Sequence, residues 1–253
     1  MLQTYLKAEN MKFKRSLFRK LILLVPAALI LTSVVFMYVG MGLDGFSSVM
    51  VCNWCMPVAS LSVVFLCHLV NNKDQKHQYR TLYSLPISLK KTFISKTILT
   101  ALNLLVMSLL LSLVTVISEC ISSGTLAPAG LTGYYIMGYC LLWFSLLWQI
   151  PFCLFLDQKV GFTCSVIINL FASALGGLFL YLTPVFWFFP YSWTARFMVT
   201  LFGVTTNGLP ASPGSRLLLS LGESLLLLLI SITAVFILSA LFSRWYRKQV
   251  YRR

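Results

Sequence analysis

Six long apolar stretches constrain this chain more than any other feature of its sequence. A helix that crosses a lipid bilayer needs about 20 consecutive, mostly apolar residues. The stretches that meet this requirement are residues 21–39, 49–69, 98–118, 134–156, 162–189 and 217–241. We therefore predict an all-α polytopic membrane protein, in which residues 1–253 form one transmembrane domain with six membrane-spanning helices.

The composition excludes the soluble classes of protein. Hydrophobic residues make up 58% of the 253 residues and charged residues only 10%, whereas a soluble domain carries about 25% charged residues. A soluble fold with this composition would expose large apolar patches. Soluble globular, fibrous and disordered structures are therefore excluded, and the lipid bilayer is the expected solvent.

The positive charges lie in alternate connecting segments. Of the 20 lysines and arginines, the N-terminal segment holds six, the second loop six, the fourth loop one and the C-terminal tail five, whereas the other loops hold two. Lysine and arginine are enriched on the cytoplasmic side of membrane proteins. This distribution predicts that both termini are cytoplasmic. It also disfavours nucleic acid, the partner that a net charge of +14 would suggest in a soluble protein.

The apolar stretches lack the side chains that ion-coupled carriers and intramembrane enzymes use. An ionisable side chain at the centre of a membrane helix costs about 2.5–3.5 kcal/mol in insertion experiments and usually marks an ion or proton pathway. Here Glu119 and Glu223 lie near the predicted outer ends of their stretches, and His68 and Asp157 lie near inner ends. A proton- or sodium-coupled carrier and an intramembrane enzyme are therefore disfavoured.

No motif for a metal, a disulfide framework or a nucleotide stands out. The seven cysteines are odd in number and lie mostly inside apolar stretches. Cys52 and Cys55 have the spacing of a redox or metal pair, but packing of two small apolar side chains is the favoured interpretation. Gly203 and Gly208 have the glycine spacing of a Walker A loop, but Leu-Pro follows where Lys-Ser/Thr belongs. We expect no catalytic residue, metal or cofactor, so ATP hydrolysis would have to come from a partner.

Polar and small residues inside the stretches give two further predictions. Asn53, Asn103 and Asn169 are candidates for a substrate path, although interhelical hydrogen bonding, worth about 0.6 kcal/mol on average, is the favoured role. Small residues at helix-contact spacing predict that the fifth stretch packs closely against another helix, in this chain or in a second copy. These residues are Ala172, Ser173, Gly176 and Gly177.

Two segments on the predicted cytoplasmic side have the pattern of short helices. Residues 1–20 form an amphipathic interfacial helix, although Glu9 and Lys20 interrupt its apolar side. Residues 70–97 contain a short amphipathic segment that ends at a Leu-Pro elbow. Ser88 can then cap the helix that leads into the third stretch.

The apolar and basic residues of this second loop require an explanation. Leu82, Leu85 and Ile87 would each forfeit about 1.5–3 kcal/mol of burial if they were left in water, so they need lipid or a docked protein. Lys90 and Lys91 fall in the first turn of a helix, where cations oppose the helix dipole. Their position indicates that they are kept there for headgroups or for a partner.

The predicted outer loop, residues 190–216, also contains a helix. Residues 195–204 are apolar but too few to span a bilayer, and prolines flank them. We expect a re-entrant or surface-lying helix, with Trp193 and Arg196 at the level of the headgroups.

Several of these segments resemble the permease subunits of ABC transporters of the ABC-2 exporter type. Residues 80–88, RTLYSLPIS, with the later Lys96, are similar to the family's L-x-S-L-P-[IV]-S … K elbow before the third span. The N-terminal run LKAENMKFKRS, leading into Leu-Val-Pro, resembles the lantibiotic-immunity branch, and so does the outer segment PYSWTAR. The resemblance covers nearly the whole chain.

The resemblance implies an exporter made of two permease chains and two cytosolic ATP-binding subunits in the bacterial cytoplasmic membrane. In the lantibiotic branch, the cargo is an amphipathic antimicrobial peptide that is removed for self-protection, and two different permease chains commonly pair. The second and fifth spans would line the path, and force would enter through the second loop and the N-terminal helix. The residues implied for this coupling are Leu82, Tyr83, Leu85, Pro86, Ile87, Ser88, Lys90 and Lys91.

Two alternatives remain at this point. One is an exporter of another amphiphile, such as a cyclic peptide antibiotic or a lipid-like drug, because apolar walls suit any hydrophobic or amphipathic cargo. The other is a membrane scaffold or sensor partner that does not transport. Copurification with an ATPase distinguishes these possibilities, since a scaffold need not bind one.

Overall fold

The computed structural model describes residues 2–13, 16–36, 38–39, 45–76, 88–123, 129–212 and 214–248. Within these ranges the chain is almost entirely helical and contains no strand beyond an isolated bridge between Val204 and Pro210. The α-helices are α1 (Leu2–Lys12), α2 (Leu17–Phe36), α3 (Phe46–Asn53), α4 (Ala59–Lys76), α6 (Leu89–Ser123), α7 (Ala129–Leu146), α8 (Gln149–Val160), α9 (Phe162–Leu178), α10 (Trp193–Phe202) and α11 (Leu221–Lys248). Short π and 3-10 turns are η3 (Trp54–Val58), η4 (Leu180–Leu182), η5 (Pro184–Trp187) and η6 (Pro190–Ser192).

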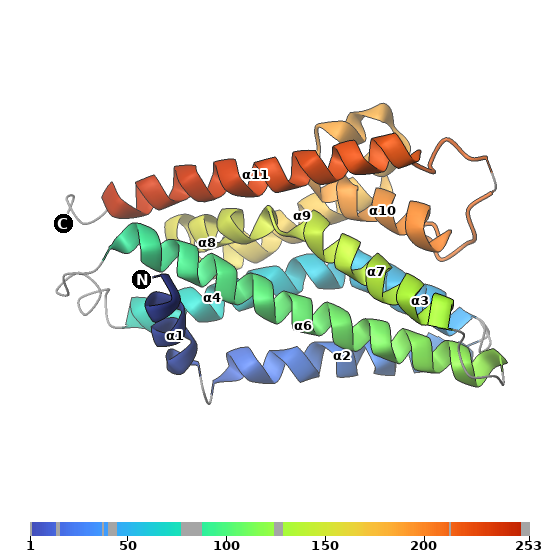
Figure 1. Cartoon of the computed structure of the whole chain (residues 1–253), viewed down its shortest axis with the longest axis horizontal. Helices are drawn as coiled ribbons and strands as arrows, with labels where there is room; N and C mark the ends of the chain where they lie inside the picture. Colours follow the sequence, from blue (N-terminus) through green and yellow to red (C-terminus); the bar gives the residue numbers. More distant parts are fainter. Residues whose placement is uncertain are drawn as a thin grey trace.

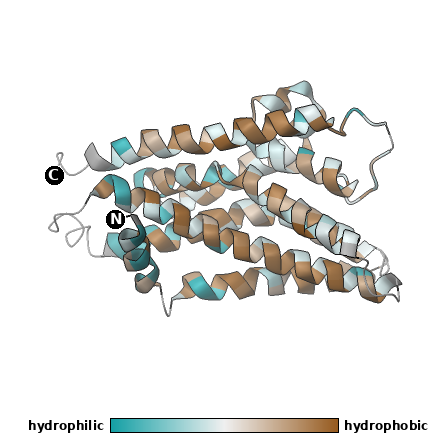
Figure 2. Cartoon of the chain, in the orientation of Figure 1, coloured by the Kyte–Doolittle hydropathy of each residue, from teal (hydrophilic) through white to brown (hydrophobic). Residues whose placement is uncertain are grey.

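The long helices lie side by side in an elongated bundle (Figure 1). One end, here called the termini end, holds α1 and the C-terminal end of α11; the opposite end is called the far end. Apolar residues run along the shafts of the helices, while hydrophilic residues gather at the termini end, above all on α1 (Figure 2). This pattern suits a bilayer, where a helix satisfies its own backbone hydrogen bonds and needs only an apolar surface.

Five helical segments are long and apolar enough to cross a membrane, and the bent pair α7–α8 makes a sixth if it counts as one span. The five are residues 17–36, 46–75, 89–122, 162–182 and 221–246. The predicted all-α polytopic membrane fold is therefore confirmed.

The predicted second and fourth spans are not straight helices. The second is interrupted by η3, where Met56 leaves the helical region (φ −145°, ψ 122°) because the following Pro57 disfavours the α conformation of the residue before it. The fourth bends by 41° between α7 and α8. Pro151 lies in the first turn of α8, where its missing N–H interrupts no helical hydrogen bond.

The N-terminal segment forms two helices rather than one. Helix α1 ends at Lys12, and the residues from Leu17 onward already form the first turn of α2. Two buried aromatic rings stand at this corner, Phe13 and Phe18, with centroids 4.7 Å apart. The corner directs α1 across the beginning of α6 at the termini end (Figure 1).

The predicted outer helix exists, but the protein buries it. Helix α10 ends at Gly203, whose φ of 64° supplies the left-handed C-cap. Trp193 donates to the Phe186 carbonyl (3.0 Å) and Arg196 to the Arg216 carbonyl (2.9 Å). Both side chains are packed within the protein and are only 3–4% exposed, while their position at the level of the headgroups stays a prediction.

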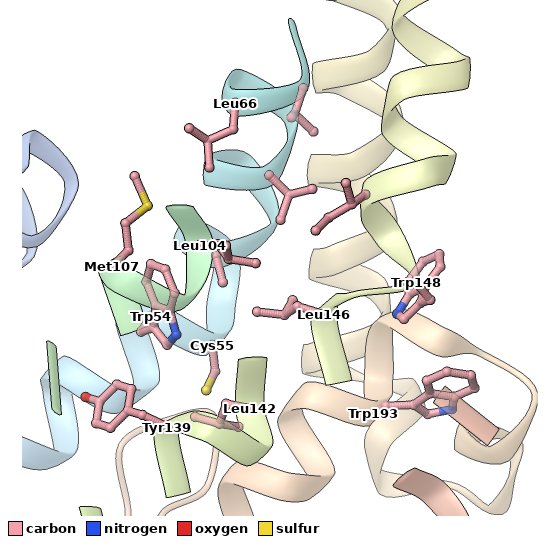
Figure 3. Packing of buried hydrophobic residues seen from close by; sticks show 14 of the residues in the cluster. Trp54, Cys55, Leu66, Leu104, Met107, Tyr139, Leu142, Leu146, Trp148 and Trp193 are labelled. Carbon is pink, nitrogen blue, oxygen red and sulfur yellow. The ribbon is translucent and has the colours of Figure 1, made fainter. Parts of the chain in front are cut away.

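Part of the apolar core lies where η3, α6 and α7 meet (Figure 3). The side chains of Trp54, Leu104, Met107 and Tyr139 are fully buried there. Tyr139 keeps a hydrogen-bond partner, since its hydroxyl lies 2.9 Å from Thr115 Oγ1. Close packing of this kind stabilises the association of helices in a membrane, because lipid provides no hydrophobic driving force for it.

Candidate functional site

Most of the predicted coupling residues lie outside the described residues. These are Leu82, Tyr83, Leu85, Pro86 and Ile87. The remaining three, Ser88, Lys90 and Lys91, lie at the start of α6 on the termini end. The site is therefore built from the elements that flank this loop: the end of α4 before it, the start of α6 after it, and α1.

Helix α1 contacts the start of α6 through Tyr5. The Ser88 backbone N–H donates to the Tyr5 hydroxyl (3.1 Å), and the Lys91 ammonium lies 6.0 Å from the centre of the Tyr5 ring. Lys90 is exposed on the same turn. The N-terminal helix thus lies directly beside one end of the predicted coupling loop.

A buried group of charges joins the same elements more firmly. The Asp74 carboxylate at the end of α4 forms an ion pair with Lys96 Nζ of α6 at 2.6 Å and accepts a hydrogen bond from Lys12 Nζ of α1 at 3.1 Å. Lys12 also pairs with Glu9 at 2.7 Å. Lys96 has no exposed surface. Removing one partner of such a buried pair leaves the other charge uncompensated, which typically costs about 3–5 kcal/mol.

Helix α11 completes this arrangement. The Tyr246 hydroxyl lies 3.5 Å from Lys96 Nζ, and the ammonium lies 5.7 Å from the centre of the Tyr246 ring. We call Glu9, Lys12, Asp74, Lys96 and Tyr246 the four-helix ion cluster, because they come from α1, α4, α6 and α11.

Sequence reasoning missed this cluster. The sequence places Lys96 in the family-like elbow and assigns no role to Asp74. One signal was present: Asp74 is the only carboxylate in residues 70–97, a segment with six lysines and arginines. The ion pair between Asp74 and Lys96 forms because α4 and α6 lie side by side. This arrangement of helices could not be predicted from the sequence.

A second acidic side chain is buried between α4 and α8. Asp157 is 2% exposed and accepts from Asn71 Nδ2 at 3.0 Å, while its other oxygen lies 2.8 Å from His68 Nδ1. The His68 ring packs on Phe162, with centroids 4.1 Å apart. His68 and Asp157, which lie near the ends of two separate apolar stretches in the sequence, are therefore in contact in the structure.

The three candidate path asparagines lie in different surroundings. Asn169 is fully buried on α9, and its carbonyl oxygen accepts from Gln149 (2.9 Å) and from the Tyr191 hydroxyl (2.6 Å). Asn103 donates to the Leu99 carbonyl of its own helix (2.6 Å). Asn53 is half-buried at the end of α3. No hydrogen bond in the described part of the chain joins the three to one another.

The small residues of α9 allow close approach of other elements of this chain. A Cβ on Gly176 would lie 2.9 Å from the Tyr191 backbone, and a Cβ on Gly177 would overlap the Met56 thioether. Ser173 is buried on the same face, and Ala172 is half-buried beside it. Helix α9 thus packs against η3 and η6 at this point.

Among the described residues, no three His, Cys, Asp or Glu side chains lie close enough together to hold a metal ion. The Cys52 and Cys55 thiols are both buried, and Cys52 donates to the Thr205 carbonyl at 3.2 Å.

Comparison with known families identifies the chain. A family model described as ABC-2 family transporter protein matches residues 5–176, which run from α1 to the last turn of α9. A comparison with curated proteins gave no match, and a comparison with solved structures gave none either. The matched region holds most of the four-helix ion cluster and more than half of the chain. This chain therefore belongs to the ABC-2 transporter family, as a multi-pass membrane permease of an ABC transporter that works with a separate ATP-binding subunit.

Proposed function

We propose that this chain is the permease subunit of an exporter that removes a lantibiotic or similar amphipathic antimicrobial peptide from the membrane. It lies in the bacterial cytoplasmic membrane with both termini in the cytoplasm, next to a second permease chain. The alternating distribution of lysine and arginine supports this orientation. The largely apolar helix shafts support an amphipathic cargo, because an apolar surface suits the apolar side of such a molecule (Figure 2).

The observation that carries the proposal is the four-helix ion cluster. It lies at the end of the bundle where the connecting segments are most basic, and it joins α1 and the start of α6 to α4 and α11. A displacement of α1 or of the loop between α4 and α6 would therefore move several membrane helices together. An ATP-binding subunit docked at this end could use that connection to open and close the path.

The test is a coupling experiment on the loop. Changing Leu82 and Leu85 together to Asp should uncouple ATP hydrolysis from export, because the partner would lose its apolar contacts. The control changes both residues to Met, which keeps the apolar surface and the approximate volume. We expect the purified chain to hydrolyse no ATP alone and to support ATP hydrolysis when its ATP-binding subunit is added.

Two measurements decide the result: the ATPase rate of the reconstituted complex, and the resistance of cells to an added lantibiotic. The Asp variant should still insert into the membrane but give at least about tenfold less resistance, as expected if at least about 1.4 kcal/mol of coupling is lost. Unimpaired resistance in that variant would refute the coupling role. A chain that copurifies with no ATPase would point to a scaffold instead.

A further inference from the structure

A small cavity lies at the far end of the bundle, where α3, α7 and α10 meet. Its volume is about 40 Å³, which is more than one water molecule requires. We call it the aromatic pocket, and its lining residues are Ser47, Ser48, Val51, Tyr134, Tyr135, Phe202 and Val204. Tyr134 is 46% exposed, so the pocket is accessible from outside the bundle.

Three aromatic rings form one wall of this pocket. The centroid of Tyr134 lies 5.6 Å from that of Tyr135 and 6.0 Å from that of Phe202, and the last two rings are 5.8 Å apart. Phe202 is held in place because its ring rests on Gly138, where a Cβ would lie only 2.6 Å from the ring. The faces of such rings attract a cation that lies within about 6 Å of their centres.

A carboxylate and hydroxyl groups adjoin the rings. The Tyr135 hydroxyl donates to the Glu119 carboxylate of α6 and accepts from the Ser47 hydroxyl. Ser48 adds a second hydroxyl to the lining. Glu119 is not among the residues that line the pocket, but its carboxylate is hydrogen-bonded to Tyr135 and adds a negative field beside the lining, which favours a cation over an anion. The Ser47 oxygen can accept a hydrogen bond from a donor that enters.

We propose that the aromatic pocket binds a primary ammonium group, the chemistry of a lysine side chain or a free N-terminus on a peptide cargo. The rings supply cation–π attraction, Glu119 supplies charge, and Ser47 supplies an acceptor for the ammonium N–H groups. The small volume favours an ammonium over the larger guanidinium of arginine. This assignment rests on the proposed function, because it makes the far end the outer face where an exporter meets an amphipathic peptide.

The first experiment measures cation binding by the chain alone, in maltoside micelles that carry no ammonium group. In a Ser48→Cys variant, the rate of carbamidomethylation by iodoacetamide at position 48 is read peptide by peptide with mass spectrometry. We expect n-butylammonium to slow this reaction and n-butanol, its uncharged counterpart, to have no effect. An Asn207→Cys variant serves as the control, because Asn207 is exposed outside the pocket and should react at the same rate with either additive.

The second step tests which groups recognise the cation. Glu119→Gln keeps an acceptor for the Tyr135 hydroxyl but removes the charge, and should raise the half-protecting concentration of butylammonium about tenfold. Tyr134→Leu should raise it about two- to fivefold, whereas Tyr134→Phe keeps the ring and should leave it unchanged. Equal protection by butanol, or no effect of Glu119→Gln in a variant that elutes as a monodisperse peak, would overturn the proposal.

The last step separates a peptide ammonium from that of a lipid headgroup. A lysine-containing amphipathic peptide with an acetylated N-terminus should protect position 48 in phosphatidylglycerol nanodiscs. The same N-acetylated peptide with acetyl-lysine in place of lysine, which carries no ammonium group, should not. Protection by phosphatidylethanolamine nanodiscs without peptide would overturn the assignment to cargo. Because these measurements need no ATP-binding subunit, their failure leaves the coupling experiment intact. A failed coupling experiment likewise leaves cation binding intact.

Discussion

The two ends of the bundle hold their connecting segments in different ways. At the termini end, α1 is joined to α4 by a pair of side chains, Lys12 and Asp74, and Asp74 is joined in turn to Lys96. At the far end, α10 and the segments around it are held by side chains that donate to backbone carbonyls, Trp193 to Phe186 and Arg196 to Arg216.

This difference determines how each end responds to substitution. An ion pair needs both side chains, so a change of either partner leaves a buried charge behind. At the far end the acceptors are backbone carbonyls, which remain when the side chain of the accepting residue is replaced. These contacts are therefore lost only when the donor side chain is replaced.

The largest expected effect is that of Asp74→Asn. It leaves the buried Lys96 ammonium without its carboxylate and should lower the free energy of unfolding by about 3–5 kcal/mol. Thermal and urea unfolding of the purified chain in detergent would measure this loss. The double variant Asp74→Leu with Lys96→Met should regain most of it, because replacing both partners with apolar residues leaves no unpaired charge. Equal instability of the two variants would contradict the ion-pair explanation.

Arg196→Met should have the next largest effect. The Arg216 carbonyl would lose a charged hydrogen-bond donor, at a cost of about 1.5–3 kcal/mol, and the guanidinium would leave the Phe186 ring, 4.1 Å away. Limited proteolysis after residue 203 and thermal unfolding would report the change. Arg216→Ala is the matched control, since its exposed side chain is lost while its carbonyl remains. That variant should stay within about 0.5 kcal/mol of the parent.

Alanine substitutions in α9 distinguish a rigid contact from a soft one. Gly176→Ala places a methyl group against the Tyr191 backbone and should destabilise the protein by about 1–3 kcal/mol. Gly177→Ala would overlap the Met56 Sδ and Cγ atoms, but these belong to a flexible side chain that can adopt another rotamer, so its cost should be smaller. Gly130→Ala meets nothing within 4 Å and should cost nothing. The opposite order of the two α9 variants in thermal unfolding would contradict the packing described here.

The smallest expected effect is that of Asn103→Leu. Within the described residues its amide donates to a carbonyl of its own helix and to no other group, so the loss should be no more than about 0.6 kcal/mol. Asn169→Leu should cost clearly more, because it removes the acceptor shared by Gln149 and Tyr191. Similar values from unfolding of the two variants would show that the buried network around Asn169 contributes little.

Much of the architecture could be predicted from the sequence, but the partners of its polar residues could not. The outer helix was expected close to its observed bounds, because a short apolar run between prolines has few alternatives. Its burial was not expected, since Arg196 finds its acceptor 20 residues later in the chain. The four-helix ion cluster was missed for the same reason: Lys96 and Tyr246 lie 150 residues apart.

The sequence by itself determined that this chain is a helical membrane protein with basic connections on alternate segments. Lipid supplies no hydrogen bonds, so apolar stretches of this length have helices as their only stable form here. The tertiary structure alone decided which side chains meet: Asp74 with Lys96, Asp157 with His68, and the rings of the aromatic pocket. The physical reason is that helices apolar on nearly every side carry little periodic signal, so their mutual rotation is fixed by packing.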